Sequence, residues 1–154
     1  MDVKLVNFPQ TKVAMIAFEG HPANEHDTVM KLVHWKIQNK LLDQSRFRSY
    51  GLHHLPKQNA NSIPYRVDFC LSIEESVEPN EFGITESKIP ECRCALARDI
   101  GSRMDNQAVK HLVHNWLPTS GEALSGLPII FHYVNVGPNV KDVDAITDVY
   151  LPLL

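Results

Sequence analysis

The chain has 154 residues, of which 44% are hydrophobic, and its formal net charge is −3 at pH 7. This length and composition fit a single domain over residues 1–154 with an ordinary core. The negative balance, without a cluster of Lys and Arg, argues against direct binding to nucleic acid. No apolar run is long enough for a membrane span, the N-terminus lacks a secretory signal pattern, and the three cysteines fit reduced thiols. A cytoplasmic protein without membrane contact is therefore expected.

The first predicted elements are a strand and a helix. Residues 12–19 are an apolar run of strand length. A helix is predicted from about 24 to 42, with Asn24 as its N-cap. Its apolar stripe, at a spacing of four, consists of Val29, Val33 and Ile37. Trp35 falls on the flank of that stripe, so it is expected to line something other than the sheet.

Two strands should follow, at 47–53 and 65–73, with a polar connection containing Pro56 and Pro64 between them. Residues 75–90 are rich in glutamate, with two prolines and a glycine, so they are predicted to be a linker. Residues 82–85 within that linker are a candidate short strand.

The segments after the linker repeat this order. They are a strand at 92–100, a helix from about 103 to 117, and strands at 129–136 and 144–153. In this helix Trp116 shares a stripe with Val109 and Leu112, so it is expected in the core.

An internal repeat supports this division. Leu32-Val33-His34 returns 80 residues later as Leu112-Val113-His114, and the strand at 67–73 matches 147–153 with an acid at the same place. Two matches in register indicate a duplicated β-α-β-β unit, at about 1–74 and 91–154, and therefore an α+β fold. The seam between such units is a natural place for a cavity.

The candidate ligand-binding residues lie on the last two predicted strands. Side chains two apart on a strand share a face, so Phe131 pairs with Tyr133 and Asp148 with Tyr150. If the strands are neighbours, three rings and one carboxylate could meet and hold a flat or cationic organic molecule. The alternative is cross-strand packing with a solvated acid. Asp68, the repeat counterpart of Asp148, is a weaker candidate of the same kind.

Signs of metal binding or catalysis are weak. His111 and His114 share a helical face, but no third ligand has metal spacing. No motif of a nucleophilic hydrolase or of a phosphate loop occurs. Neither a metal nor a cofactor is expected, and an enzyme is the less favoured reading.

The duplicated plan carries three further motifs: Leu32-Val33-His34-Trp35, Leu127-Pro128 followed by Phe131-His132-Tyr133, and the terminal Asp148-Val149-Tyr150. Together these resemble the GyrI-like family, the effector-binding domain of AraC/XylS-type and some MerR-type bacterial regulators, which also occurs in stand-alone form. The resemblance implies a curved antiparallel sheet with two helices and a ligand groove between the halves. It also implies ligand-binding roles for Trp35, Asp148 and Tyr150.

One departure concerns the groove acid. Family members often carry a glutamate on the penultimate strand, where this chain has Phe131 and His132. Asp148, Asp68 or Glu19 would then have to supply the negative charge for a cationic ligand.

Three functions follow from the resemblance. The favoured one is an effector-binding protein for small hydrophobic, cationic aromatic compounds, without its own DNA-binding module. The alternatives are a hydrolase that uses Asp148 and Tyr150 in the same groove, and a protein-interaction module similar to a gyrase inhibitor. A regulator, gyrase or a second copy of the chain are the macromolecular partners considered.

Overall fold

The computed structural model describes residues 1–55 and 65–154. Within these residues, eight strands form one antiparallel sheet in the order β1-β6-β8-β7-β3-β4-β2-β5. The strands are β1 (Lys4–Phe8), β2 (Thr11–Gly20), β3 (Ser49–His53), β4 (Tyr65–Ser72), β5 (Thr85–Ile89), β6 (Cys92–Ile100), β7 (Ile129–Tyr133) and β8 (Ile146–Pro152).

Two helical segments accompany the sheet. The first is α1 (His26–Gln38), which follows the 3₁₀ turn η1 (Pro22–Asn24). The second runs continuously through α2 (Gln107–Lys110), the π-helical η2 (His111–Trp116) and α3 (Leu117–Ser120). Pro118, two residues after the end of the π-helical turn, has no N–H for the α-helical ladder. A short 3₁₀ turn, η3 (Asp142–Asp144), precedes β8.

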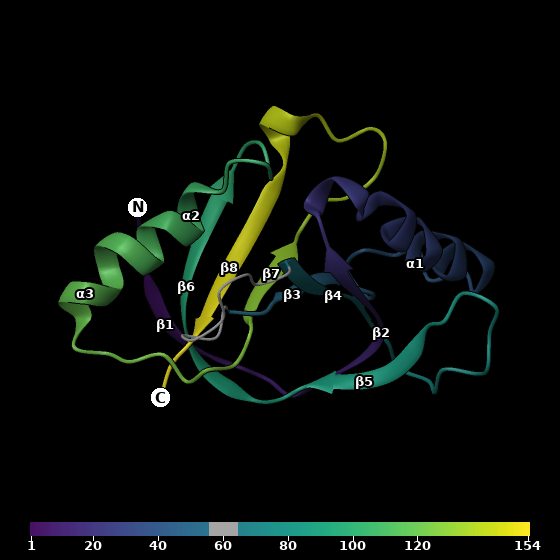
Figure 1. Cartoon of the computed structure of the whole chain (residues 1–154), viewed down its shortest axis with the longest axis horizontal. Coiled ribbons are helices and arrows are strands. Elements are labelled where there is room, and N and C mark those ends of the chain that lie inside the picture. The colour runs from purple at the N-terminus through teal and green to yellow at the C-terminus, as the bar shows by residue number, and fades with distance from the viewer. Residues whose placement is uncertain (56–64) are drawn as a thin grey trace.

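The two helices cover different parts of one sheet face. Helix α1 contacts β2 and β4, whereas α2 contacts β6 and β8. The central pair β3 and β7 lies between them, with α1 to the right and α2 with α3 to the left in Figure 1. The duplicated β-α-β-β order and the α+β class predicted from the sequence are confirmed.

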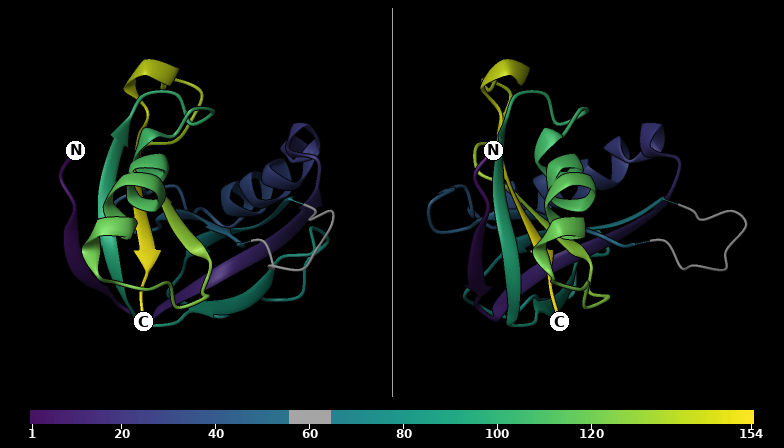
Figure 2. Two further views of the ribbon diagram at one scale, coloured as in Figure 1. Left: turned by 60° about the vertical axis from the view of Figure 1, so that its left-hand side comes forward. Right: turned by 90° about the vertical axis from the view of Figure 1, so that its left-hand side faces the viewer.

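Each outer strand pairs with a strand from the other half of the sequence. Strand β1 runs directly into β2 but pairs with β6, and β5 runs into β6 but pairs with β2. The sheet curls strongly, and the ends of β1 and β5 approach each other near the C-terminus, as Figure 2 shows. Phe8 at the end of β1 and Ile89 at the end of β5 belong to one buried cluster on the face opposite the helices.

Several predicted boundaries are wrong for local reasons. Strand β1 was not predicted, although three of its five residues are apolar; it is short, and only Phe8 is fully buried. Strand β5 lies at the end of the stretch predicted to be a linker, after the candidate strand at 82–85. Asn24 belongs to η1, and the residue at the N-cap of α1 is Glu25. The polar connection with Pro56 and Pro64 lies outside the described residues, and none of the described helices could span a membrane.

Candidate functional site

A cavity of about 340 Å³ lies over the central strands, between α1 and the segment that precedes α2. We call it the central cavity. Helix α1 lines it with Val29, Leu32, Val33 and Lys36, and the residue before that helix, Glu25, also lines it. The segment before α2 lines it with Arg103, Met104 and Asn106. The strands contribute mainly Ser49, His53, Tyr65, Phe69, Phe131 and Tyr133.

The floor of the cavity is a group of packed rings. His53 and Phe131 stack with their ring centroids 4.0 Å apart and 29° between their planes. His53 also meets the edge of Tyr65 at 5.9 Å, and its Nε2 lies 3.3 Å from Oη of Tyr133. Burial lowers the pKa of His53 from 6.5 to about 4, so its imidazole is neutral at pH 7. The floor is therefore aromatic and uncharged.

A close approach of backbone and ring shapes this floor. Ser49 of β3 lies opposite Tyr133 of β7, and the ring of Tyr133 lies over Gly51. A Cβ atom at position 51 would come within 3.0 Å of Cζ of Tyr133. The absence of a side chain at Gly51 thus lets Tyr133 lie flat against β3.

The only carboxylate lining the cavity in the described part of the chain is Glu25. The hydroxyl of Tyr65 donates a hydrogen bond to its Oε2 at 3.0 Å. Burial and this contact both raise the pKa of Tyr65, so the phenol remains protonated and continues to donate.

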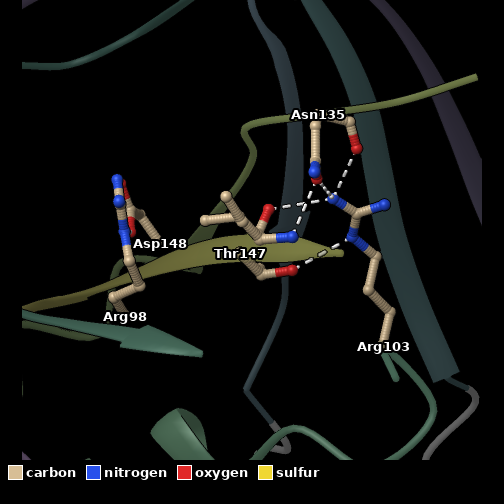
Figure 3. A network of polar contacts seen from close by, with 6 residues as sticks. Arg98, Arg103, Asn135, Thr147 and Asp148 are labelled. Carbon is tan, nitrogen blue, oxygen red and sulfur yellow. Dashed lines mark hydrogen bonds and ion pairs between the residues drawn. The ribbon is translucent and has the colours of Figure 1, made fainter. Parts of the chain in front are cut away.

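Two basic side chains from the described residues line the cavity. Arg103 donates from Nε to Oγ1 of Thr147 at 3.0 Å and from Nη2 to the carbonyls of Asn135 and Ile146, as Figure 3 shows in part. Its guanidinium also lies 5.2 Å from the ring centroid of Tyr133. Lys36 lies in the last turn of α1. Burial lowers the pKa of both side chains, because it removes water from the charged forms.

The structure brings Phe131 and Tyr133 together at the cavity but separates them from Asp148 and Tyr150. In the β7–β8 ladder Phe131 lies opposite Val149, and Tyr133 opposite Thr147. Residues directly opposite each other share a face, so Asp148 and Tyr150 point to the face away from the helices. The prediction that these four side chains meet is therefore wrong.

The two acids predicted as ligand anchors already have partners on that other face. Asp148 accepts a bidentate pair from Arg98, at 2.7 Å from Nε and 3.0 Å from Nη2 (Figure 3). Asp68 lies 2.7 Å from Nε2 of His54. Glu19 is exposed on β2 and does not line the central cavity.

Trp35 is placed differently from the prediction, whereas Trp116 packs against the core as expected. Trp35 is only 6% exposed and packs with Phe47 and Leu71 in the core beneath α1, outside the central cavity. Trp116 is partly buried against the core beneath α2. The predicted stripe of α1 is wrong in two respects: Val29 and Val33 face the cavity, and Ile37 is 53% exposed.

Several cavity residues were missed by the sequence reasoning, namely Glu25, Lys36, His53, Tyr65 and Arg103. One signal was available for two of them. Glu25, Val29, Val33 and Lys36 recur at intervals of four, four and three, which places them on one side of the helix. No comparable spacing connects Arg103 with the helix, because the fold alone brings the segment before α2 to this place. Among the described residues, no group of three His, Cys, Asp or Glu side chains could hold a metal ion.

The profile of the GyrI-like small molecule binding domain matches residues 1–154. The chain belongs to the GyrI-like family. A GyrI-like relative by sequence is the probable transcriptional regulator YgiV of Escherichia coli K12, which is 30% identical over 99% of this chain and 96% of its own length.

Solved structures show the same GyrI-like fold. The crystal structure of the EcmrR C-terminal domain has a TM-score of 0.74 at 14% identity, covering 99% of this chain and 97% of that one. The chain spans 57% of EcmrR in its complex with DNA. SAV2435 bound to tetraphenylphosphonium has a TM-score of 0.56 at 9% identity, covering 100% of this chain and 94% of that one.

Proposed function

We propose that this protein binds a small, flat, hydrophobic organic molecule in the central cavity and serves as an effector-binding domain. The observation that carries the proposal is the ring floor of His53, Phe131 and Tyr133 within a cavity of about 340 Å³. Pockets for small molecules have this size range, and they combine apolar and aromatic walls with a few polar groups. The rings offer stacking area, and neutral His53 adds no charge that would need water.

The relatives suggest what ligand binding serves. YgiV carries the name of a probable transcriptional regulator, and EcmrR has been solved in complex with DNA. By analogy, ligand occupancy of this chain would be passed on to a regulatory partner. The aromatic ligand of SAV2435 is consistent with a ring-lined site in this fold.

A hydrolase remains the second candidate, favoured by one contact. Glu25 and Tyr65 bring a carboxylate and a phenol together at the cavity, 3.0 Å apart. Such a pair could position a water molecule for attack on a reactive ligand. Asp148 is not available for this role, since it is paired with Arg98 on the other face. Mass analysis of ligands after incubation with the protein and with Tyr65→Phe would detect turnover.

The binding proposal is tested by calorimetric titration with 1-naphthaleneacetamide, a neutral two-ring compound. Phe131→Ala should weaken its binding at least about ten-fold, because a stacking surface is lost. The matched control is Phe82→Ala, since Phe82 packs on the core beneath α1 and does not line the cavity. Equal affinities for both variants would contradict the proposal.

A further inference from the structure

Three side chains of the central cavity carry hydrogen-bond donors for which the described residues provide no acceptor. They are the ammonium of Lys36, Nη1 of Arg103 and Nδ2 of Asn106, and all three residues line the same cavity. Among these, Nδ2 of Asn106 is fully buried, and a buried donor without a partner costs free energy, so native structures rarely leave one. The half-buried side chains of Lys36 and Arg103 add two donors that an acceptor inside the cavity could satisfy.

Asn106 gives the sharpest evidence. The residue is 8% exposed, and its Oδ1 accepts a hydrogen bond from the backbone N–H of Val109 at 3.0 Å. This cap of α2 fixes the orientation of the amide, so the other atom must be the Nδ2 donor. Nδ2 is buried and has no hydrogen-bond partner among the described residues.

The two cations also lack acidic partners. Within the described residues, no carboxylate oxygen lies within 4.0 Å of Lys36 or Arg103. Nε and Nη2 of Arg103 donate to neutral oxygens of Thr147, Asn135 and Ile146. Nη1 donates to none of these residues in Figure 3. Removing a charge from water without a partner is costly, and an incoming anion would offset that cost.

The single carboxylate of the lining does not balance these charges. Glu25 precedes α1 and accepts a hydrogen bond from the hydroxyl of Tyr65. Lys36 lies in the last turn of the same helix. At 1.5 Å per residue these two positions are about 16 Å apart along the helix axis. Glu25 is thus far from Lys36, and in the described part of the chain the cavity lining has two basic side chains and one carboxylate.

We propose that the central cavity selects aromatic ligands that carry an acidic group, such as a carboxylate, and that Lys36, Arg103 and Asn106 bind that group while the rings stack on the floor. This inference rests on the proposed function, because it concerns the occupant of the same cavity. It differs from the cationic ligand expected from the sequence, for which Asp148, Asp68 or Glu19 would have to supply the negative charge.

A charge series on one ring system tests the inference. The probes are 1-naphthaleneacetate, the neutral 1-naphthaleneacetamide and the cationic 2-(1-naphthyl)ethylammonium, titrated by calorimetry at pH 7.5. The acetate should bind at least about ten-fold more tightly than the amide, and the ammonium most weakly. Lys36→Met should weaken acetate binding far more than amide binding, so that the preference for the acetate shrinks, whereas Lys36→Arg should keep the preference.

The matched control is Lys31→Met, because Lys31 is exposed on α1 and does not line the cavity. It should leave all three affinities unchanged, which separates a local contact from the loss of one positive charge. Asn106→Asp is a second variant: its carboxylate can still accept from Val109 but would repel the acetate. Acetate binding should fall most, while the melting temperature reports whether the cap is kept.

The outcomes separate the two proposals. If the amide or the ammonium binds the wild type as tightly as the acetate, or if Lys36→Met weakens all three probes equally, the charge inference is overturned and the binding proposal stands. If none of the three probes binds the wild type, the binding proposal fails, and the charge inference fails with it.

Discussion

Gly51 and Tyr133 lie on adjacent central strands, and the phenol ring occupies the space that a side chain at position 51 would need. Gly51→Ala should therefore push Tyr133 away from β3. We expect a loss of about 1 to 3 kcal/mol in the free energy of unfolding, as for other overpacked sites. Affinity for a naphthalene ligand should fall as well, because Tyr133 forms part of the floor. Denaturant titration and calorimetry measure the two effects.

The double variant Gly51→Ala/Tyr133→Phe provides the control. Removing the hydroxyl relieves the closest part of the clash, so the double variant should be more stable than the sum of the single losses predicts. Strict additivity would show that the two positions do not compete for the same space.

Trp35 and Trp116 should differ in what they stabilise. Trp35→Ala removes a ring that is 6% exposed and should cost about 3 to 5 kcal/mol of unfolding free energy. Trp116 is only partly buried, so Trp116→Ala should cost clearly less. Chemical denaturation of both variants decides the order, and a larger loss for Trp116→Ala would contradict the packing described above.

Asp148→Asn should leave ligand binding unchanged. The carboxylate lies on the sheet face away from the cavity and is paired with Arg98, whose side chain is 53% exposed. Because solvent screens such a pair, its loss should cost no more than about 1 kcal/mol of stability. Titration of wild type and variant with 1-naphthaleneacetate gives the answer. A ten-fold change in affinity would mean that this face takes part in binding.

The stability of the fold should fall in acid partly through His53. Burial lowers the pKa of His53 from 6.5 to about 4, so the unfolded chain binds more protons than the folded one between these values. Stability contributed by neutral His53 is fully present above pH 6.5 and is lost as the pH falls toward 4, by up to about 3 kcal/mol. His53→Phe, which keeps a ring over Phe131, should flatten the unfolding free energy profile between pH 6.5 and 4. An unchanged slope in that variant would exclude His53 as the cause.

Much of the fold could be predicted because its signals are local. The repeat of Leu32-Val33-His34 and of two strands in register gave the β-α-β-β order, and strand β6 was predicted with its observed limits. Strand β1 escaped prediction since it is short and is held by β6, more than 80 residues away. A short stretch of sequence does not show which distant strand it pairs with.

The site was harder to predict because it depends on which face of the sheet or of the helix each side chain lies on. Alternation correctly paired Phe131 with Tyr133 and Asp148 with Tyr150, but only the ladder register shows that the two pairs lie on opposite faces. On α1, periodicity defined the apolar arc without showing which flank meets the sheet. Lys36, a charged residue within that arc, was the available sign that the arc does not face only a core.

The exchanged outer strands limit how the cavity can admit a ligand. Because β1 belongs in sequence to one half and pairs with the other, and β5 does the reverse, the two halves of the sequence cannot separate without breaking both outer ladders and the central β3–β7 ladder. We therefore expect a ligand to enter by local shifts of α1 or of the segment around Met104, a residue that is 93% exposed. Ligand exchange should then follow the kinetics of side-chain and helix fluctuation, and the sheet should keep its amide hydrogen-exchange protection while ligands come and go.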